Sequence, residues 1–237
     1  MSEGRQRHTS PSRPIKVLFE DEHYVVFDKP AGLLVIPSPK EDNTLVHIVN
    51  SRYISPEDSF RLHPCHRLDR DTSGAIIFAK GKKKQQLMMQ LFRQRAIRKK
   101  YIAFVHGKLK PQQGEMRSMI KDFHQKKFDR HSRARLAITR YRVIETRKYF
   151  SIVEASPLTG RTNQIRIQFS EAGFPLVGER KYAFARDFAL RFRRVALHAS
   201  TLEWLHPVMH KPIKVVSPLP EDMVEFIARN ENKTRSQ

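Results

Sequence analysis

Residues 17–38 read VLFEDEHYVVFDKPAGLLVIPS, and the regular pattern of the chain begins here. Short β-branched and aromatic runs alternate with Pro-Ala-Gly punctuation, which is typical of strands joined by turns. The chain contains neither G-x-G-x-x-G nor G-x-x-x-x-G-K-[ST], and it lacks regular strand–helix–strand alternation. The pattern therefore argues against a nucleotide-binding fold of the Rossmann or P-loop type.

Further strands are expected at residues 75–79, 101–106, 137–145, 149–155, 164–169 and 214–217. Residues 82–96 predict a helix, because four apolar side chains share one of its faces: Leu87, Met88, Leu91 and Phe92. A last short helix fits residues 221–229. Many strands with few helices predict an α+β or mostly β protein built on a mixed or antiparallel sheet.

The composition is that of a folded protein whose positive charge favours binding to polyanions. The 237 residues are 39% hydrophobic, and 45 Lys and Arg residues against 24 Asp and Glu residues leave a net charge of +21. This length favours one domain or two tightly joined lobes. The single cysteine, Cys65, excludes an internal disulfide framework and fits the cytoplasm.

The ends of the chain differ from its middle. Residues 1–14 are polar and predict a disordered basic arm without the apolar centre of a secretory signal, and residues 230–237 predict a flexible tail. The longest apolar runs fall far short of the roughly 20 residues that span a bilayer. We therefore expect one domain at residues 15–229, without membrane association, in the cytoplasm.

The positive charge is segregated into three stretches, at residues 80–110, 121–148 and 180–194, and no acidic residue lies between Asp71 and Glu115. Aromatic residues interleave with the later charges: Phe123, Phe128, Tyr182, Phe184, Phe188 and Phe192. This combination suits phosphate neutralisation and base stacking, so RNA or DNA is the expected partner. A merely solvated basic face is the alternative, but a surplus this large repels itself unless a polyanion compensates it.

Two segments carry candidate chemistry. In HPCHRLDRDTSG (63–74), Asp69 and Asp71 stand just before an apolar strand, which suits a reactive carboxylate, although Asp and hydroxyl side chains also form ordinary turns. LTGRTNQIRIQ (158–168) predicts a turn and a strand that places Arg166 on a polar face, where a cleft would offer it a carboxylate. A solvent-facing strand is the alternative for the second segment.

Metal and thiol chemistry have little support. His and Cys residues cluster twice, as His63, Cys65 and His66 and as His198, His206 and His210. Neither cluster has C-x-x-C or H-E-x-x-H spacing, and nothing marks Cys65 as activated. We expect no metal site.

The segment HRLDRDTSG resembles the signature of the RluA family of RNA pseudouridine synthases. The resemblance extends in order to KPAGLLV (29–35), KKYIAFVHG (99–107), LTGRTNQIRIQ (158–168), FPLVGERKYA (174–183) and LHASTLEWLHP (197–207). It implies a single α+β catalytic domain with a mixed, largely antiparallel central sheet flanked by a few helices. It also implies an isomerase that breaks the uridine N1–C1′ bond, turns the uracil and rejoins it through C5, without a cofactor.

The resemblance assigns roles to particular residues. Asp69 would be the catalytic carboxylate, Arg166 its partner, and Tyr101 the residue stacked on the uracil and a candidate base for the C5 proton. A guanidinium nearby favours the ionised carboxylate that attack requires. Arg67 would fill the gap left by the flipped nucleotide. The residues expected to contact RNA are Arg67, Thr72, Arg98, Lys99, Lys100, Arg161, Asn163 and Gln164.

Some alternatives stay open. The family commonly has His where this chain has Asn163 and Gln168, which affects RNA contacts and packing more than chemistry. The sequence does not choose between a covalent adduct at C1′, attack on the pyrimidine and elimination to a glycal. A non-catalytic RNA-binding or ribosome-assembly protein and a DNA glycosylase are the rival functions. We expect a monomer that acts on ribosomal or transfer RNA.

Overall fold

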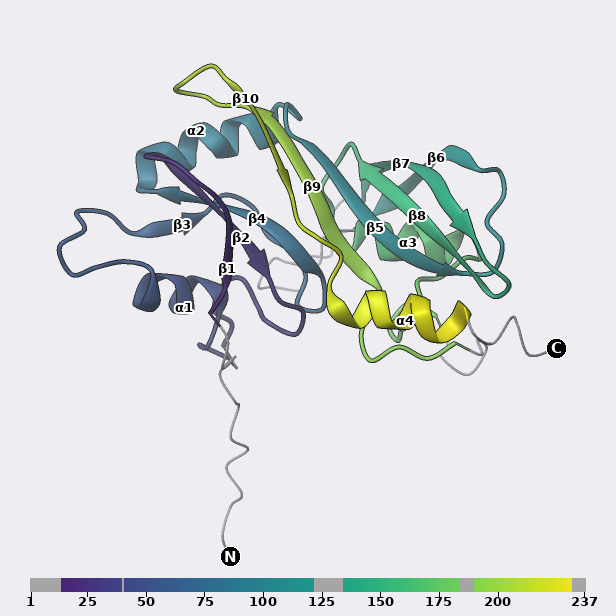
Figure 1. The fold of residues 1–237 in the computed structure, drawn as a ribbon. Helices are drawn as coiled ribbons and strands as arrows, with labels where there is room; N and C mark the ends of the chain where they lie inside the picture. The colour runs from purple at the N-terminus through teal and green to yellow at the C-terminus, as the bar shows by residue number, and fades with distance from the viewer. Residues whose placement is uncertain (1–13, 40, 122–133, 184–189, 232–237) are drawn as a thin grey trace, which may run out of the picture.

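The computed structural model describes residues 14–39, 41–121, 134–183 and 190–231. Within these residues one mixed sheet runs through the molecule in the strand order β1-β2-β4-β9-β5-β8-β7-β6, with β3 beside β4 and β10 beside β9 (Figure 1). Its pairs are antiparallel except β4 with β9, which are parallel. The predicted α+β fold with a mixed, largely antiparallel sheet is confirmed.

The described strands are β1 (Lys16–Glu20), β2 (Tyr24–Lys29), β3 (Leu62–Pro64), β4 (Ser73–Lys80), β5 (Arg98–His106), β6 (Gln113–Ile120), β7 (Arg135–Thr146), β8 (Phe150–Pro157), β9 (Leu197–Leu205) and β10 (Pro212–Val216). The described helices are α1 (Leu45–Arg52), α2 (Lys82–Arg93), α3 (Gln164–Glu171) and α4 (Glu221–Glu231). No helix in the described ranges has the length and apolar character needed to cross a membrane.

The strand predicted at residues 164–169 is wrong, because these residues form helix α3. Gln164, Ile165, Gln168 and Phe169 are buried, which is the i, i+1, i+4, i+5 spacing of a helix face. Asn163 precedes the helix in the left-handed conformation, with a φ of 54°, and turns the chain into it. The alternation of Ile165, Ile167 and Phe169 suggested a strand, but Ile165 and Phe169 also share a helix face.

The helices α1 and α2 pack on opposite faces of β2 and β4. Val25, Phe27, Ile76 and Phe78 share a core cluster with α1. The alternate residues of the same two strands, such as Val26 and Ile77, share another cluster with Met88 of α2 and with Trp204. This is the alternation that a pleated strand imposes on its side chains.

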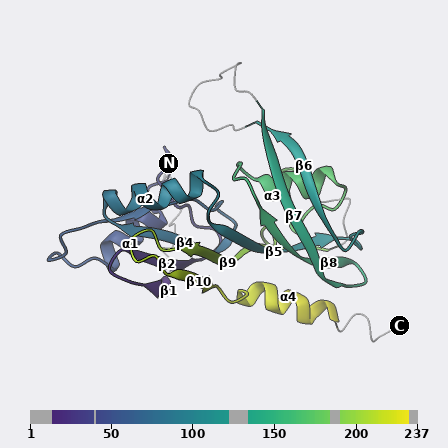
Figure 2. The same ribbon diagram turned by 90° about the horizontal axis from the view of Figure 1, so that it is seen from above.

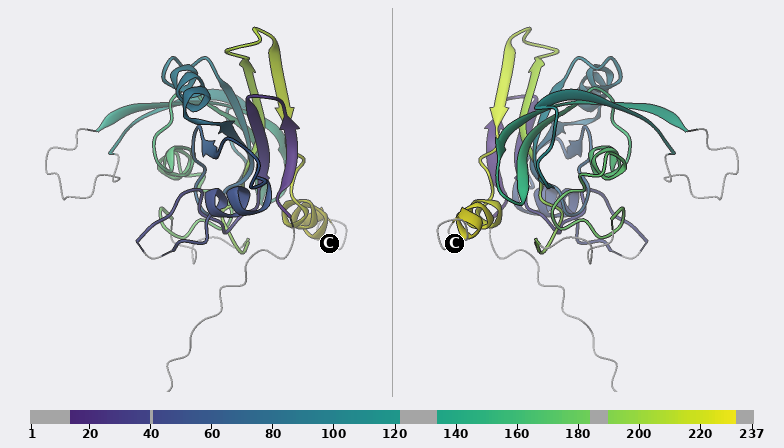
Figure 3. Two further views of the ribbon diagram at one scale, coloured as in Figure 1. Left: turned by 90° about the vertical axis from the view of Figure 1, so that its left-hand side faces the viewer. Right: turned by 90° about the vertical axis from the view of Figure 1, so that its right-hand side faces the viewer.

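The second half of the sheet is covered by α3 on one face and α4 on the other (Figures 2 and 3). Ala103 and Val105 of β5 pack with Phe169 of α3. The intervening Phe104 packs instead with Phe226 of α4. The pairing of β5 with β9 shifts register between Lys100 and Tyr101, and this irregularity lies beside the cavity described below.

The parallel contact between β4 and β9 is unusually close. Gly74 has a φ of +113°, and a Cβ atom there would lie 2.3 Å from the carbonyl oxygen of Ala199. The neighbouring Ser73 hydroxyl lies 2.9 Å from Nδ1 of the buried His198. Glycine is therefore required where the segment containing Asp69 enters the sheet.

Some sequence predictions lie outside the described residues. They are most of the basic arm and of the tail, residues 122–133 and 184–189 of the basic stretches, and four aromatic residues within them, Phe123, Phe128, Phe184 and Phe188.

Candidate active site

The loop between β3 and β4 carries Asp69 and is fastened to the loop that follows β2. The Gly32 N–H donates to the Arg70 carbonyl at 2.9 Å, and the Thr72 N–H donates to the Asp69 carbonyl at 3.2 Å. Lys29 Nζ donates to the same Arg70 carbonyl at 2.9 Å. The backbone from Asp69 to Thr72 is therefore held by hydrogen bonds.

The side chain of Lys29 is fully buried, with 0% of the residue exposed. Its Nζ also donates to the carbonyls of Pro30 and Leu33, at 2.9 and 2.7 Å. Burial lowers the pKa of Lys29 to about 7, although the charges of Asp71 and Asp69 act in the opposite direction. The three carbonyls account for its donors, so Lys29 joins the two loops.

Arg194 holds the same loop from another side. Its Nη1 donates to the Asp71 carbonyl at 3.1 Å and to the carbonyls of Val195 and Leu197. Its Nε and Nη2 contact the Asp222 carboxylate at 2.7 and 2.9 Å. Helix α4 is thereby connected to the backbone two residues beyond Asp69.

Asp69, Tyr101 and Arg166 all line one cavity of about 1090 Å³. They come from the β3–β4 loop, from β5 and from α3. Burial and the charge of Asp69 raise the pKa of Tyr101 above its ordinary value. The phenol is therefore protonated at neutral pH, so it can accept a proton only if its own proton is transferred elsewhere.

Arg166 has a second carboxylate partner that the sequence did not identify. Its Nε lies 2.8 Å from Glu179 Oε2, and its Nη2 lies 2.8 Å from Glu179 Oε1. Burial lowers the pKa of Arg166, but Glu179 and then Asp69 more than offset this and raise it. Arg166, the expected partner of Asp69, therefore interacts electrostatically with Asp69 and at the same time forms a bidentate ion pair with Glu179.

Glu179 is itself held by backbone donors. The N–H groups of Arg180, Lys181 and Tyr182 contact Oε1 at 3.0, 2.8 and 3.3 Å. Burial raises the pKa of Glu179, but the hydrogen bonds from Arg166 and from the N–H groups of Lys181 and Tyr182 outweigh burial and lower the pKa. The segment FPLVGERKYA was a signal for this residue, although spacing alone could not pair it with Arg166.

Asn163 completes the surroundings of Arg166. Its Oδ1 accepts from Arg166 Nη1 at 2.9 Å, and its Nδ2 donates to the Tyr182 hydroxyl at 3.0 Å. The guanidinium carbon of Arg166 lies 5.3 Å from the Tyr182 ring centroid. In this chain Asn163 orients Arg166 from within the protein.

Gln164 organises the loop that precedes α3. Its Oε1 accepts from the Thr159 hydroxyl at 2.7 Å and from the Arg161 N–H at 3.0 Å. Its Nε2 donates to the Ile138 carbonyl and to Thr139 Oγ1. These four contacts engage the amide of Gln164 within the protein. The Nε2 of Gln168 donates to the carbonyls of Met116 and Ala137.

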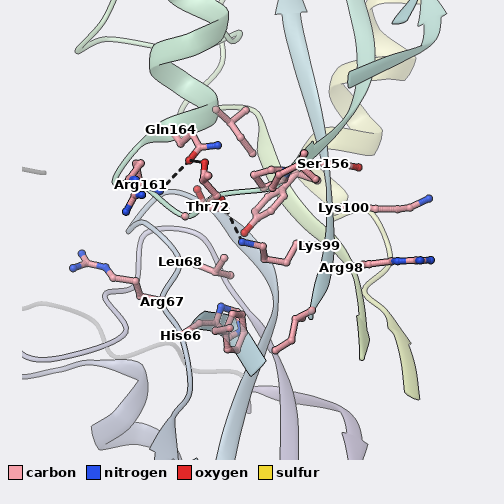
Figure 4. A pocket seen from close by; sticks show the side chains of 18 of the residues that line it. His66, Arg67, Leu68, Thr72, Arg98, Lys99, Lys100, Ser156, Arg161 and Gln164 are labelled. Atoms are coloured by element: carbon pink, nitrogen blue, oxygen red, sulfur yellow. Dashed lines mark hydrogen bonds between the residues drawn. The ribbon is translucent and has the colours of Figure 1, made fainter. Parts of the chain in front are cut away.

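The basic side chains expected to contact RNA point in two directions. Lys99 points toward the side of β5 on which Thr72 lies, whereas Arg98 and Lys100 point the opposite way (Figure 4). Lys99 Nζ lies 3.5 Å from the Thr159 carbonyl, and Lys100 Nζ lies 3.3 Å from Glu154 Oε2. Arg67 is exposed at the edge of the cavity. The basic residues expected to contact RNA, Arg67, Arg98, Lys99, Lys100 and Arg161, all line the cavity that Asp69 lines, and of those on β5 only Lys99 points toward Thr72.

The His and Cys residues next to Asp69 have structural contacts. His66 Nε2 accepts from the Ile77 N–H at 3.0 Å, and burial lowers the pKa of His66 to about 3. Cys65 is buried, and this raises the pKa of its thiol. Across the described ranges, no three His, Cys, Asp or Glu side chains are grouped so that they could hold a metal ion.

Comparisons with known proteins identify relatives of this chain. The family model described as RNA pseudouridylate synthase matches residues 23–171. Ribosomal large subunit pseudouridine synthase D of Xanthomonas campestris is 35% identical over 246 residues, which cover 94% of this chain and 72% of that protein. Dual-specificity RNA pseudouridine synthase RluA of Pasteurella multocida is 32% identical over 218 residues, which cover 89% of this chain and 96% of that protein.

A solved structure has the same fold. The structure of human RNA pseudouridylate synthase domain containing 4 superposes with a TM-score of 0.75 at 25% sequence identity. The match covers 91% of this chain and 92% of the human one.

Proposed function

The chain belongs to the RNA pseudouridylate synthase family, and from this premise we propose that it isomerises uridines of large-subunit ribosomal RNA, with Asp69 as the catalytic carboxylate. It is an isomerase of the RluA family, as its sequence motifs predict. The observation that carries the residue assignment is the meeting of Asp69, Tyr101 and Arg166 at one cavity.

The isomerisation conserves every atom of the nucleotide. The N1–C1′ bond breaks, a C5–C1′ bond forms, and the proton lost from C5 is balanced by a proton gained at N1. Asp69 supplies the negative charge beside the ribose, and Arg166 balances part of it, since the charge of Asp69 raises the pKa of Arg166. Tyr101, buried and protonated, offers its ring for stacking on the uracil and its hydroxyl for hydrogen bonding.

The target nucleotide has to leave its stack before it can reach Asp69. Extrusion costs roughly a few kcal/mol, and a protein group that fills the gap recovers part of it. Arg67 is exposed two residues before Asp69, and its planar cation can stack on bases. We assign this role to Arg67.

The names of the relatives support ribosomal RNA as the substrate. Several that are 33–35% identical are named ribosomal large subunit pseudouridine synthase D. A relative named dual-specificity RNA pseudouridine synthase makes a further RNA class, such as transfer RNA, the second candidate. We further propose that the protein works in the cytoplasm as a monomer, and its one cysteine, which is buried, fits a reducing compartment.

The test is to incubate purified protein with unmodified large-subunit ribosomal RNA and transfer RNA and to map pseudouridine. We expect conversion of particular uridines by the wild type, and none by Asp69→Asn with RNA binding retained. Asp71→Asn is the matched control, because Asp71 lies in the same loop but does not line the cavity. The conversion rate of this variant should fall by less than about tenfold.

Three results would contradict the proposal. Turnover by Asp69→Asn would remove the catalytic assignment of Asp69. Binding without any conversion by the wild type would favour the non-catalytic RNA-binding protein. Release of free base would identify a glycosylase, because the isomerase leaves the mass of the RNA unchanged.

A further inference from the structure

A shallow groove follows the outer face of α2, next to the catalytic cavity. Its lining residues all belong to α2 and form one stripe of the helix at i, i+3, i+4, i+7 and i+10: Lys83, Gln86, Leu87, Gln90 and Arg93. Arg93 lines this groove and also the cavity that holds Asp69. The two hollows therefore meet at Arg93.

The charged residues of this stripe, Lys83 and Arg93, are both positive. None of its lining residues is acidic, and its Lys, Arg and Gln side chains all offer hydrogen-bond donors. The first turn of α2 holds Lys82, Lys83 and Lys84 without an acidic residue, at the end where the helix dipole is already positive. An anion along the stripe would relieve this repulsion.

The opposite flank of the helix differs. Lys84 Nζ donates to the Glu22 carbonyl at 3.3 Å, and the nearby Lys80 pairs with Glu20 at 2.7 Å. Positive charge on that flank is engaged by the end of β1 and the turn between β1 and β2. Lys83, in the same helical turn as Lys84, lines the groove instead.

We propose that the α2 groove binds the sugar-phosphate backbone of the RNA strand that leaves the catalytic cavity, running from Arg93 toward Lys83. This proposal rests on the proposed function. The ten-residue separation corresponds to about 15 Å of helix, room for about four stacked nucleotides at about 3.4 Å each. The exposed Leu87 offers apolar contact to a base or ribose between the two charges. In Figure 2, α2 extends away from its junction with β5, as this path requires.

The test measures binding of labelled oligouridylates of about five and about twenty nucleotides from about 0.05 to about 0.5 M NaCl. Each phosphate contact with a single strand adds about 0.7 to the slope of log K against log salt. We expect Lys83→Gln to lower the slope for the longer probe by about 0.7 and to weaken binding about fivefold at about 0.1 M salt. Gln90→Glu should also weaken it, through like-charge repulsion.

Lys84→Gln is the matched control, because it removes the same charge from the same helical turn on the other flank. It should leave the slope for both probes within about 0.2 of the wild-type value. Equal losses for Lys83→Gln and Lys84→Gln would overturn the proposal. An unchanged slope for the longer probe with Lys83→Gln would also overturn it, because Lys83 would then contact no phosphate. Circular dichroism of each variant checks that α2 is intact.

Failure of the groove can be distinguished from failure of the proposed function. Uridine conversion by the wild type is measured separately, so an inactive protein whose binding still depends on Lys83 contradicts only the catalytic proposal. If the wild type converts uridines of ribosomal RNA and Lys83→Gln leaves RNA binding unchanged, only the proposal of the α2 groove is contradicted. Polyglutamate binding that depends on Lys83 as strongly as RNA binding would indicate an acidic protein partner and overturn the assignment to RNA.

Discussion

Arg166 and Glu179 form a bidentate ion pair beside Asp69, with two N–O distances of 2.8 Å. Arg166 lines the cavity and Glu179 does not, so the role of Glu179 is to position Arg166. We predict that Glu179→Gln lowers the single-turnover rate by about 10- to 100-fold while the Kd for RNA changes less than about threefold. Removing one member of a buried pair also destabilises the fold by about 3 kcal/mol.

The control for Glu179→Gln is Glu171→Gln, which removes an equal charge from the exposed end of α3. It should change neither the rate nor the stability by a measurable amount. A purely structural role for Glu179 would lower the fraction of folded enzyme without changing the rate per folded molecule. Active-site titration against the single-turnover rate separates these outcomes.

Lys29 predicts a pH dependence of stability. Its pKa is about 7 in the folded protein, against an ordinary value of 10.5 in the unfolded chain, so between these values the unfolded chain binds more protons. The unfolding free energy should therefore rise with pH across this window, by up to about 1.4 kcal/mol per pH unit. Urea unfolding at several pH values from about 7 to about 9.5 should show this rise in the wild type and a flatter profile in Lys29→Met. Parallel profiles would contradict the prediction.

Asp222 predicts a link between α4 and the Asp69 loop. Asp222→Asn weakens the bidentate contact that orients Arg194, and Arg194 holds the Asp71 carbonyl. We expect about a fivefold lower turnover with an unchanged Kd for RNA, because Asp222 is not among the residues that line the cavity. Glu225→Gln, on the same helix, is the control. Similar effects of the two variants would mean that α4 acts only through general stability.

The strands predicted at residues 75–79, 101–106, 137–145, 149–155 and 214–217 are present as β4, β5, β7, β8 and β10, whereas β3, β6, β9 and α1 were not predicted. The described β6 was missed because QGEMRSMI is half exposed and poor in β-branched residues. Helix α3 was mistaken for a strand because its turn depends on Asn163 and on amide contacts of Gln164 with β7. The contacts with β7 involve residues that only the folded chain brings together.

The candidate site shows the same division. The motifs predict that Asp69, Tyr101 and Arg166 gather at one place, and they line one cavity. The pairing of Arg166 with Glu179 could not be deduced from the sequence. Glu179 lies in the loop after α3, and only the folded chain brings its carboxylate to Arg166. The sequence motifs also did not predict the contacts of Lys29 and Arg194 with the Asp69 loop. Both side chains donate to backbone carbonyls, which every residue type provides, so no sequence pattern marks the acceptors.

Gly74 predicts a large destabilisation on substitution. Gly74→Ala combines a φ of +113° with a Cβ atom 2.3 Å from the Ala199 carbonyl oxygen. Backbone strain and overpacking together should cost about 4 kcal/mol. Gly173→Ala is the control, because Gly173 has a φ of +82° but open space around it, so only about 1–2 kcal/mol is expected. Equal losses in urea unfolding would show that the close approach of β4 to β9 is not required.

His66 predicts sensitivity to acid. Its pKa is about 3 in the folded protein, because burial disfavours the charged ring, against an ordinary value of 6.5 in the unfolded chain. Below pH 6.5 the unfolded chain therefore binds a proton that the folded protein does not, and the unfolding free energy falls as pH falls. Between about pH 7 and about pH 5 this should cost about 1–2 kcal/mol. His66→Gln keeps an acceptor for the Ile77 N–H but cannot titrate, so its stability should fall less over the same range. Urea unfolding of both proteins measures the difference, and identical acid losses would mean that His66 is protonated in the folded state at little cost.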